Sequence, residues 1–203
     1  MTSSTVVLSF VCLTGTGTGT GTGFAIGAMN VWSISMAEHH EQDMLSGIIP
    51  AAFSTGSFLD GLIYGSRTWK GATADRLITA GAVFLAGWRP LVALPGPLAA
   101  TLPGAFLTSV VACAYVTTDA PAPAGRTGEA YAWLILSIGV GQSAGTALAG
   151  GLAEQPLASA ALPAAGAAFA LAVLLVARPT PQPTSRPAQD ALLRAKSHYF
   201  QPF

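Results

Sequence analysis

Charged residues are missing from most of this 203-residue sequence and are confined to short stretches between long apolar runs. Lysine, arginine, aspartate and glutamate together make up only 9% of the residues. A soluble domain carries about 25% charged residues, because most of its surface must remain wetted. The deficit predicts that hydrocarbon, not water, surrounds most of the chain, and that the fold is an all-α integral membrane protein, since helices satisfy their own backbone hydrogen bonds in lipid.

The apolar runs are bounded by charges or by proline and glycine clusters. A helix that crosses the hydrocarbon core needs roughly 20 predominantly apolar residues. On this basis the sequence predicts one domain at 7–177 with six transmembrane helices, at about 7–36, 44–64, 77–94, 98–118, 129–152 and 156–177. The proline-rich remainder, 178–203, is expected to lie outside the bilayer as a cytoplasmic tail.

The basic residues lie on one side of this topology, apart from Arg89. They fall between the second and third spans, between the fourth and fifth, and after the sixth: Arg67, Lys70, Arg76, Arg126, Arg178, Arg186, Arg194 and Lys196. Cytoplasmic loops carry an excess of lysine and arginine. We therefore expect a multi-pass protein of the cell membrane with both termini in the cytoplasm.

The first span opens with an alternation of glycine and threonine, TGTGTGTGTG, from Thr14 to Gly23. Strict alternation does not fit the spacing of a dinucleotide-binding fingerprint, and no G-K-[ST] follows for a phosphate-binding loop. A flexible linker is a second interpretation. We favour a weak stretch of transmembrane helix in which glycine permits close helix approach. The role of the repetition itself stays open, and a low-complexity expansion without a role is one interpretation.

Two charges fall within the predicted spans and are functional hypotheses by default. Asp60 lies near the cytoplasmic end of the second span, where it could carry a coupling proton or form an ion pair with Arg67 and Lys70 that anchors the loop. Arg89 lies within the third span, and its long side chain is expected to extend to the outer interface.

A resemblance to a known family rests on three stretches of the chain. GSFLDGLIYGSRTWKG, Gly56 to Gly71, resembles the cytoplasmic-loop motif of the major facilitator superfamily, with Gly61 at the opening glycine and Arg67 and Lys70 at the basic end. Gly65 stands where the motif has aspartate. The stretches IGAMNVWSISMAEHHEQDMLSGIIPAAFSTGSF and SIGVGQSAGTALAGGLAE are similar to helices seven, eight and eleven of bacterial drug-efflux-like members.

This resemblance implies the C-terminal six helices of a six-plus-six transporter, which exchanges protons for small organic molecules. Such transporters bind substrate between their two repeats near the bilayer midplane. Polar residues of the spans, first of all Asn30, Gln142 and Ser143, are then substrate-contact candidates. The alternative is that each forms an ordinary hydrogen bond between helices. One bundle supplies only one wall of a transport path, so we expect a need for an N-terminal half or a second copy.

Other function classes find little support in the sequence. A net charge of zero argues against a nucleic-acid partner. EHHE, Glu38 to Glu41, is the one cluster of metal-ligand types, and we interpret it as a solvated loop without a metal. No catalytic motif or cofactor-binding motif indicates an enzyme. The remaining alternative is a non-transporting membrane scaffold, assembly subunit or inactive relic.

Overall fold

The computed structural model describes the backbone of residues 3–67, 73–89, 97–119 and 127–176. Within these ranges the chain forms α-helices, one short 3-10 helix and no strand. In chain order the elements are α1 (Ser3–His39), α2 (Leu45–Gly65), α3 (Thr73–Gly87), η1 (Pro97–Ala100), α5 (Thr101–Asp119), α6 (Thr127–Gly151) and α7 (Pro156–Val176). The all-α class predicted from the sequence is confirmed for this part of the chain. The predicted tail, 178–203, lies outside it.

Helix α3 and the predicted third span differ at their C-terminal ends. The predicted span ran to Leu94, whereas α3 ends at Gly87. Trp88 forms a turn after the end of α3, and Arg89 beyond it is helical again. Arg89 follows the end of α3, and its side chain is exposed. The residues from Pro90 to the end of the predicted span lie outside the described part.

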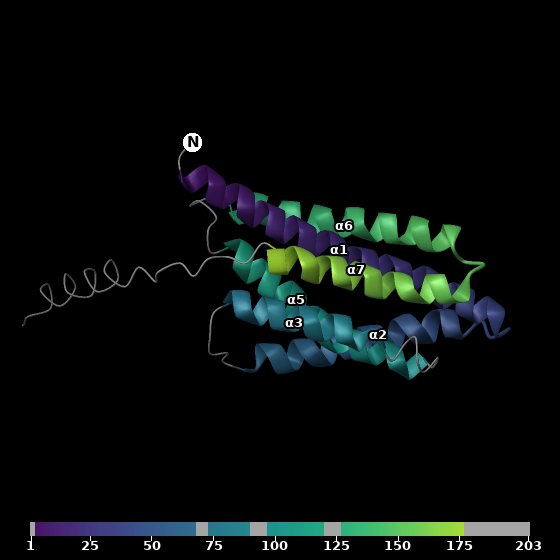
Figure 1. Cartoon of the computed structure of the whole chain (residues 1–203). Coiled ribbons are helices and arrows are strands. Elements are labelled where there is room, and N and C mark those ends of the chain that lie inside the picture. Colours follow the sequence, from purple (N-terminus) through teal and green to yellow (C-terminus); the bar gives the residue numbers. More distant parts are fainter. Residues whose placement is uncertain (1–2, 68–72, 90–96, 120–126, 177–203) are drawn as a thin grey trace, which may run out of the picture.

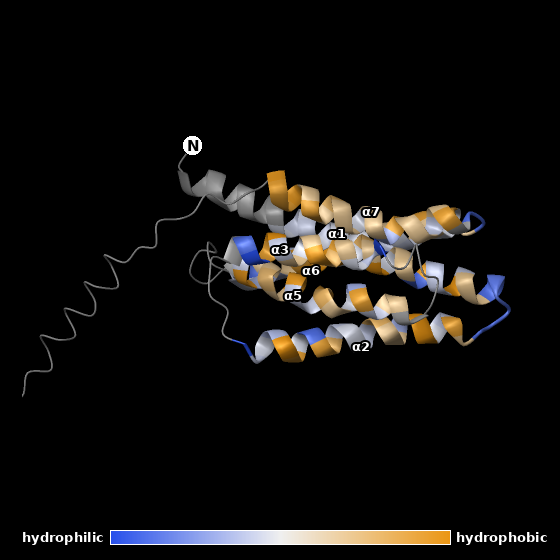
Figure 2. Ribbon diagram, turned by 60° about the horizontal axis from the view of Figure 1, so that its bottom comes forward, coloured by the Kyte–Doolittle hydropathy of each residue, from blue (hydrophilic) through white to orange (hydrophobic). Residues whose placement is uncertain are grey.

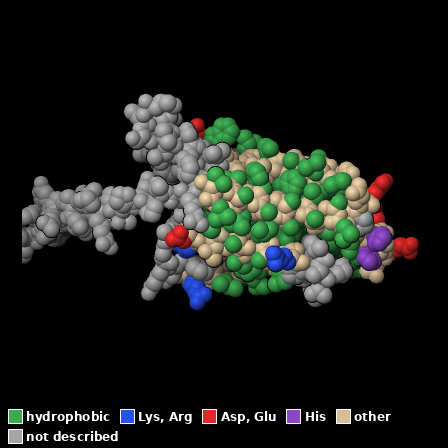
Figure 3. All heavy atoms as spheres, viewed as in Figure 1, with side chains coloured by type: hydrophobic (Ala, Val, Ile, Leu, Met, Phe, Trp, Pro, Cys, Tyr) green, Lys and Arg blue, Asp and Glu red, His purple; other side chains and the backbone are tan. Residues whose placement is uncertain are grey.

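The helices run side by side and alternate in direction along the chain (Figure 1). Their bodies are mostly hydrophobic, and hydrophilic residues gather mainly in the loops and at the helix ends (Figure 2). His39, His40 and several acidic residues lie together at the end of the bundle that carries the α1–α2 loop (Figure 3). An apolar belt between two polar ends is the distribution that a membrane-spanning bundle requires.

In the part of the chain that the structure describes, three helices are long and apolar enough to cross a membrane: Thr101–Thr118 in α5, Thr127–Gly151 in α6 and Leu157–Val176 in α7. Between 28% and 33% of each segment is buried inside the bundle, so most of its apolar surface faces outward. A monomeric soluble protein rarely exposes apolar patches of this extent. These helices therefore suggest membrane association, and the six-span count stays a prediction.

The helix contacts repeat between the two halves of the chain, α1–α3 and α5–α7. Helix α1 packs on α6 and α7, and α5 correspondingly packs on α2 and α3. Helix α1 also contacts α2, and α5 correspondingly contacts α6. The two halves contact each other through the equivalent pairs α1 with α5 and α3 with α7. Among the α-helices of the described residues, the contact of α6 with α7 lacks a counterpart, and the contacts of η1 with α2 and α5 have none either. Because α1 and α5 run in opposite directions (Figure 1), the halves are arranged as an inverted repeat.

Helix α1 holds the glycine-threonine repeat at the centre of this arrangement. Residues four apart lie on the same face of an α-helix. A strict alternation therefore produces four ridges, two of glycine and two of threonine. Gly19, Gly23 and the later Gly27 face α6, whereas Gly17 and Gly21 face α7. The repeat thus gives α1 a smooth surface toward two neighbours at once.

The contact between α1 and α6, here called the glycine seam, is too close for side chains. A Cβ built at Gly23 would overlap the carbonyl oxygen of Ile138, and one built at Gly141 would overlap that of Thr20. The buried small residues of α6 recur every four positions: Ser137, Gly141, Gly145 and Ala149. Small residues at this spacing allow helix backbones to approach in lipid. The close helix approach predicted for these glycines is therefore confirmed, and the glycines of the repeat form a packing surface.

The threonines of the repeat occupy two different environments. The Thr20 hydroxyl donates to the carbonyl oxygen of Thr16, one turn earlier, at 2.8 Å. Thr22 is buried, and its hydroxyl has no partner among the described residues. It borders a void of about 10 Å³ lined mainly by apolar side chains, including Val110 and Leu134. A water molecule needs two or more polar partners, so this void leaves the hydroxyl of Thr22 unsatisfied.

The EHHE stretch forms the end of α1. The backbone N–H of Gln42 donates to the carbonyl oxygen of Ala37 at 2.9 Å, and Glu41 adopts a positive φ of 53°. This is the Schellman ending, in which glycine usually occupies the left-handed position. His39 and His40 are exposed, and their ring centroids lie 5.4 Å apart. Within the described residues, no group of three or more metal-ligating side chains is placed to hold an ion.

Candidate functional site

Side chains of α2 and α5 meet in three hydrogen-bonded pairs, here called the polar seam. The pairs are Ser57 with Thr108, Asp60 with Ser109, and Tyr64 with Cys113. The three residues of α2 are spaced three and four positions apart, which places them on one face of the helix. The seam therefore joins the two helices from the middle of α2 to its C-terminal end.

Asp60 lies at the centre of the polar seam and is 7% exposed. One carboxylate oxygen accepts the backbone N–H of Ser109, and the other accepts its hydroxyl, each at 2.6 Å. Hydrogen bonds to an ionised acceptor are about twice as strong as neutral ones. The partner that the structure gives Asp60 is Ser109 of α5, and the ion pair of Asp60 with Arg67 stays a prediction. Lys70 lies outside the described residues.

Tyr64 closes the polar seam near the C-terminal end of α2. Its hydroxyl lies 3.0 Å from the sulfur of Cys113, which is fully buried and not in a disulfide. Backbone contact is also tight along this pair of helices. A Cβ at Gly56 would overlap the carbonyl oxygen of Thr101. In the same way, Cβ atoms at the glycines of α1 and α6 would overlap carbonyl oxygens of the facing helix. Both seams thus use glycine, and the α2–α5 seam adds side-chain hydrogen bonds.

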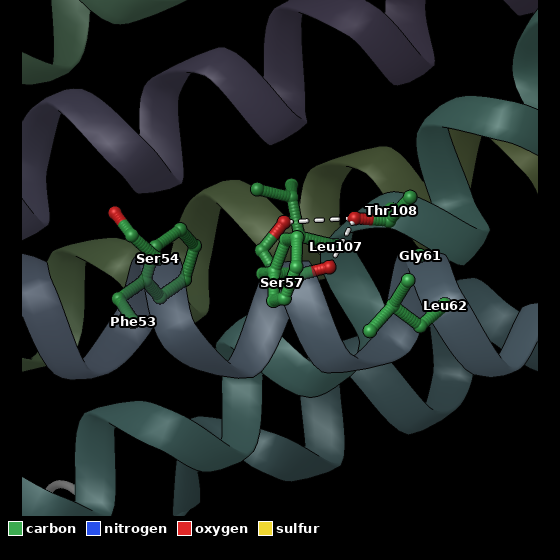
Figure 4. A pocket seen from close by; sticks show the side chains of 8 residues that line it. Phe53, Ser54, Ser57, Gly61, Leu62, Leu107 and Thr108 are labelled. Carbon is green, nitrogen blue, oxygen red and sulfur yellow. Dashed lines mark hydrogen bonds between the residues drawn. The ribbon is translucent and has the colours of Figure 1, made fainter.

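A groove of about 460 Å³ lies between α2 and α5, beside the polar seam (Figure 4). Apolar side chains and hydroxyls line it: Phe53, Ser54, Ser57, Phe58, Gly61, Leu62, Leu107 and Thr108. The Thr108 hydroxyl donates to the carbonyl oxygen of Ser57 at 2.7 Å and lies 2.8 Å from the Ser57 hydroxyl. Both lining hydroxyls of the seam therefore have partners within the protein.

The predicted loop motif is divided between different surroundings. Gly61 lines the groove, and a Cβ there would lie 3.3 Å from the Thr108 methyl carbon. Gly65 is the last residue of α2 and borders open space. Arg67 follows the helix end with an exposed side chain. Gly61 of the motif thus lies in the groove between α2 and α5, whereas Arg67 at its basic end lies in the loop after α2.

The predicted substrate contacts lie on α1 and α6, away from the α2–α5 groove. Asn30 is half-buried, and Gln142 is exposed, with its backbone against Gly27 of α1. Neither side-chain amide hydrogen-bonds another described residue. Ser143 is exposed, and its hydroxyl donates to the carbonyl oxygen of Gly139 in its own helix at 3.0 Å. Asn30 and Gln142 thus lie on the neighbouring helices α1 and α6, and their amide donors and acceptors are unused among the described residues. The hydroxyl donor of Ser143, in contrast, is used within its own helix.

Sequence reasoning missed Thr108 and Ser109. Both lie in the fourth predicted span, for which no polar residue was proposed as a contact. Their adjacency within an apolar run was the available signal, because two neighbouring hydroxyls in a membrane helix need partners. The pairing with Ser57 and Asp60 depends on the register of two helices that are far apart in the sequence.

Comparison with known proteins adds no relative, since no family model, curated protein or solved structure matches this chain.

Proposed function

We propose that this chain is one six-helix half of a secondary transporter of the major facilitator type, which exports small organic molecules in exchange for protons. The observation that carries the proposal is that the helix contacts made by α1–α3 are repeated by α5–α7 in an inverted arrangement. Inverted three-helix repeats within each six-helix half are a feature of this transporter class. The loop motif at Gly61 and the small residues of α6 support the same assignment.

The substrate path in this proposal lies on α1, α2, α5 and α6. These helices carry the groove and the side-chain amides of Asn30 and Gln142, which have no hydrogen-bond partner among the described residues. An amide that faces hydrocarbon without a hydrogen bond costs several kcal/mol. A polar substrate or a second bundle would supply the missing partners. This favours substrate contact at Asn30 and Gln142 over exposure to lipid.

The second wall of the path comes from another bundle. Alternating access requires two bundles that move against each other around a shared site. An N-terminal half or a second copy of this chain would provide it. The distribution of the basic residues supports a location of this assembly in the cell membrane with both termini in the cytoplasm.

Asp60 is the proposed coupling residue. Acidic groups buried within membrane spans commonly carry protons in pumps and transporters. Its carboxylate contacts α5 directly through Ser109, so a change in its protonation would alter the contact between α2 and α5. Asp60→Asn keeps the shape and removes the proton site. We expect it to abolish proton-coupled flux while leaving the protein folded; unchanged coupled flux would remove Asp60 from this role.

The function is tested in proteoliposomes with an imposed pH gradient and a panel of neutral compounds as probes. Three samples are compared: the single chain, a linked tandem of two copies, and the chain with a six-helix N-terminal half. We expect proton-coupled export from a two-bundle sample and none from the single chain. Correct insertion without flux of any of these compounds in all three samples would favour a non-transporting scaffold.

A further inference from the structure

We propose that the groove between α2 and α5 binds an uncharged, elongated, apolar molecule with a single hydrogen-bonding group. As a substrate class, this inference rests on the proposed transport function; as a binding site, it depends on the groove alone. The volume of about 460 Å³ lies within the range of small-molecule sites, about 300–1,000 Å³. By comparison, the void beside Thr22 is about 10 Å³.

The lining excludes charged ligands. None of the residues around the groove is ionisable. The nearby carboxylate of Asp60 is buried, does not line the groove and gives both oxygens to Ser109. A charged ligand would therefore lose its hydration in an apolar groove without gaining a counterion. A neutral ligand pays no such cost.

The shape of the groove selects an extended molecule. Its lining residues on α2 run from Phe53 to Leu62, which spans about 14 Å at the helical rise of 1.5 Å per residue. Figure 4 shows the labelled side chains set out along the helix in this order. Phe58 is 66% exposed and Leu62 is 56% exposed, so the groove opens on the side of the bundle. An apolar molecule would then enter from within the bilayer.

The hydroxyls provide one position for a polar group. The hydroxyl donors of Ser57 and Thr108 are already used within the polar seam. Ser54 lies at the Phe53 end of the groove and makes no hydrogen bond with the described residues. Its hydroxyl can donate or accept one bond. The groove thus matches a ligand such as a long-chain alcohol, with its hydroxyl at Ser54 and its chain toward Leu62.

The aromatic stack beside the groove provides a direct readout. Phe53 lines the groove and stacks on Trp88 with ring centroids 6.0 Å apart. Bromine quenches tryptophan fluorescence only at short range. We would add 2,3-dibromostearyl alcohol, whose bromines lie beside the hydroxyl, to the chain in nanodiscs of saturated lipid, and run the matching carboxylate and trimethylammonium compounds in parallel. A fourth sample would contain dibrominated phosphatidylcholine, which tests whether an ordinary lipid chain fills the groove.

We expect saturable quenching by the alcohol, at least tenfold weaker binding of both charged compounds, and loss of the quenched component in Trp88→Phe. Gly61→Leu, which fills the groove, should weaken binding of the alcohol at least tenfold. Gly47→Leu is the matched control, because Gly47 lies on the same helix and borders open space. Leu62→Ala and Ser54→Ala should each weaken binding severalfold, which keeps the test valid if Gly61→Leu does not fold.

Equal quenching by all three compounds, or full quenching by the brominated lipid that the alcohol cannot displace, would overturn the inference. No saturable quenching by the alcohol would overturn it as well. The measurement needs no flux. Binding without transport in any sample would retain the site and remove the proposed function, whereas transport without quenching would do the reverse.

Discussion

The two seams of this bundle occupy equivalent positions in the inverted repeat, and each joins a helix of one half to a helix of the other half. They are held together differently. The glycine seam joins α1 to α6, and its only cross-helix side-chain hydrogen bond in the described part runs from the Thr146 hydroxyl to the Gly27 carbonyl at 3.5 Å. The polar seam joins α5 to α2 through three side-chain pairs, with both oxygens of Asp60 bonded. Both seams contain glycines whose Cβ atoms would overlap the facing backbone.

The comparison separates what a close helix contact needs from what a particular function adds. Glycine spacing is common to both seams and sets how near the helices lie. Hydrogen-bonded side chains, a buried carboxylate and a groove occur on the α2–α5 side. Packing by glycine is therefore sufficient for a seam in this bundle, and we interpret the polar pairs as additions that serve the site.

The largest effect is expected where the glycine seam is overpacked. Gly141→Ala places a methyl group against the carbonyl oxygen of Thr20 and should lower the free energy of unfolding by about 3 kcal/mol. Gly139→Ala is the control on the same helix, where the Cβ meets open space. It should raise the stability by up to about 1 kcal/mol, because alanine is the better helix former. Both are measured by denaturant titration in mixed micelles. Equal changes of the same sign would show that close approach does not hold this seam.

A second substitution tests the centre of the polar seam. Ser109→Ala removes the hydroxyl that bonds the buried carboxylate of Asp60 and should cost about 2 kcal/mol. Ser143→Ala removes a hydroxyl that bonds only its own helix and should change the stability by less than about 0.5 kcal/mol. The same titration compares the two. A loss at Ser109 no larger than that at Ser143 would mean that Asp60 contributes nothing to the seam.

Thr22 gives a prediction of opposite sign. Its buried hydroxyl has no partner among the described residues, so Thr22→Val removes an unsatisfied group with little change of shape. We expect a gain of about 1 kcal/mol. Thr20→Val, which removes a hydroxyl bonded to the Thr16 carbonyl, serves as the control and should give no gain. A loss of stability in Thr22→Val would place a polar partner beside this hydroxyl.

The smallest effect distinguishes the seams by coupling. A double-mutant cycle on Ser57→Ala and Thr108→Val should show about 0.6 kcal/mol of interaction, the average for hydrogen bonds between membrane helices. The same cycle on Asn30→Ala and Gln142→Ala should show less than about 0.3 kcal/mol, because no bond joins their amides. Comparable coupling in both cycles would remove the distinction between the two seams.

Much of the fold could be predicted from where charge and proline occur. The uncharged runs identify helical segments, because an apolar helix in lipid tolerates few charges and satisfies its own backbone. The end of α3 was less predictable, since a mostly apolar sequence, with Arg89 as its one charge, continues past Gly87 toward Leu94. The packing role of the glycine-threonine repeat was recognised only as close approach. Its four ridges follow from helix geometry, but the neighbour that each ridge contacts depends on the tertiary arrangement.

The candidate site was less predictable than the fold. Asp60 stands out in the sequence as a charge within a span, yet its partner lies 49 positions away in α5. Arg67 and Lys70 were proposed as its partners because they are close to Asp60 in the sequence. The register between α2 and α5 cannot be read from the sequence. The same limit hid Thr108, whose role depends on the face that α5 turns toward α2. Asn30 and Gln142 were identified by polarity alone, and their function stays a prediction.

The central claim is that α1–α3 and α5–α7 cross the bilayer in opposite directions. Single cysteines at His40 and Gly128, introduced into a chain lacking Cys12 and Cys113, test it through their accessibility in intact cells to a membrane-impermeant maleimide. The first position follows α1, and the second begins α6 after α5. We predict labelling of His40→Cys from outside and labelling of Gly128→Cys only after permeabilisation. Labelling of both from the same side would contradict the inverted arrangement and, with it, the account of the two seams.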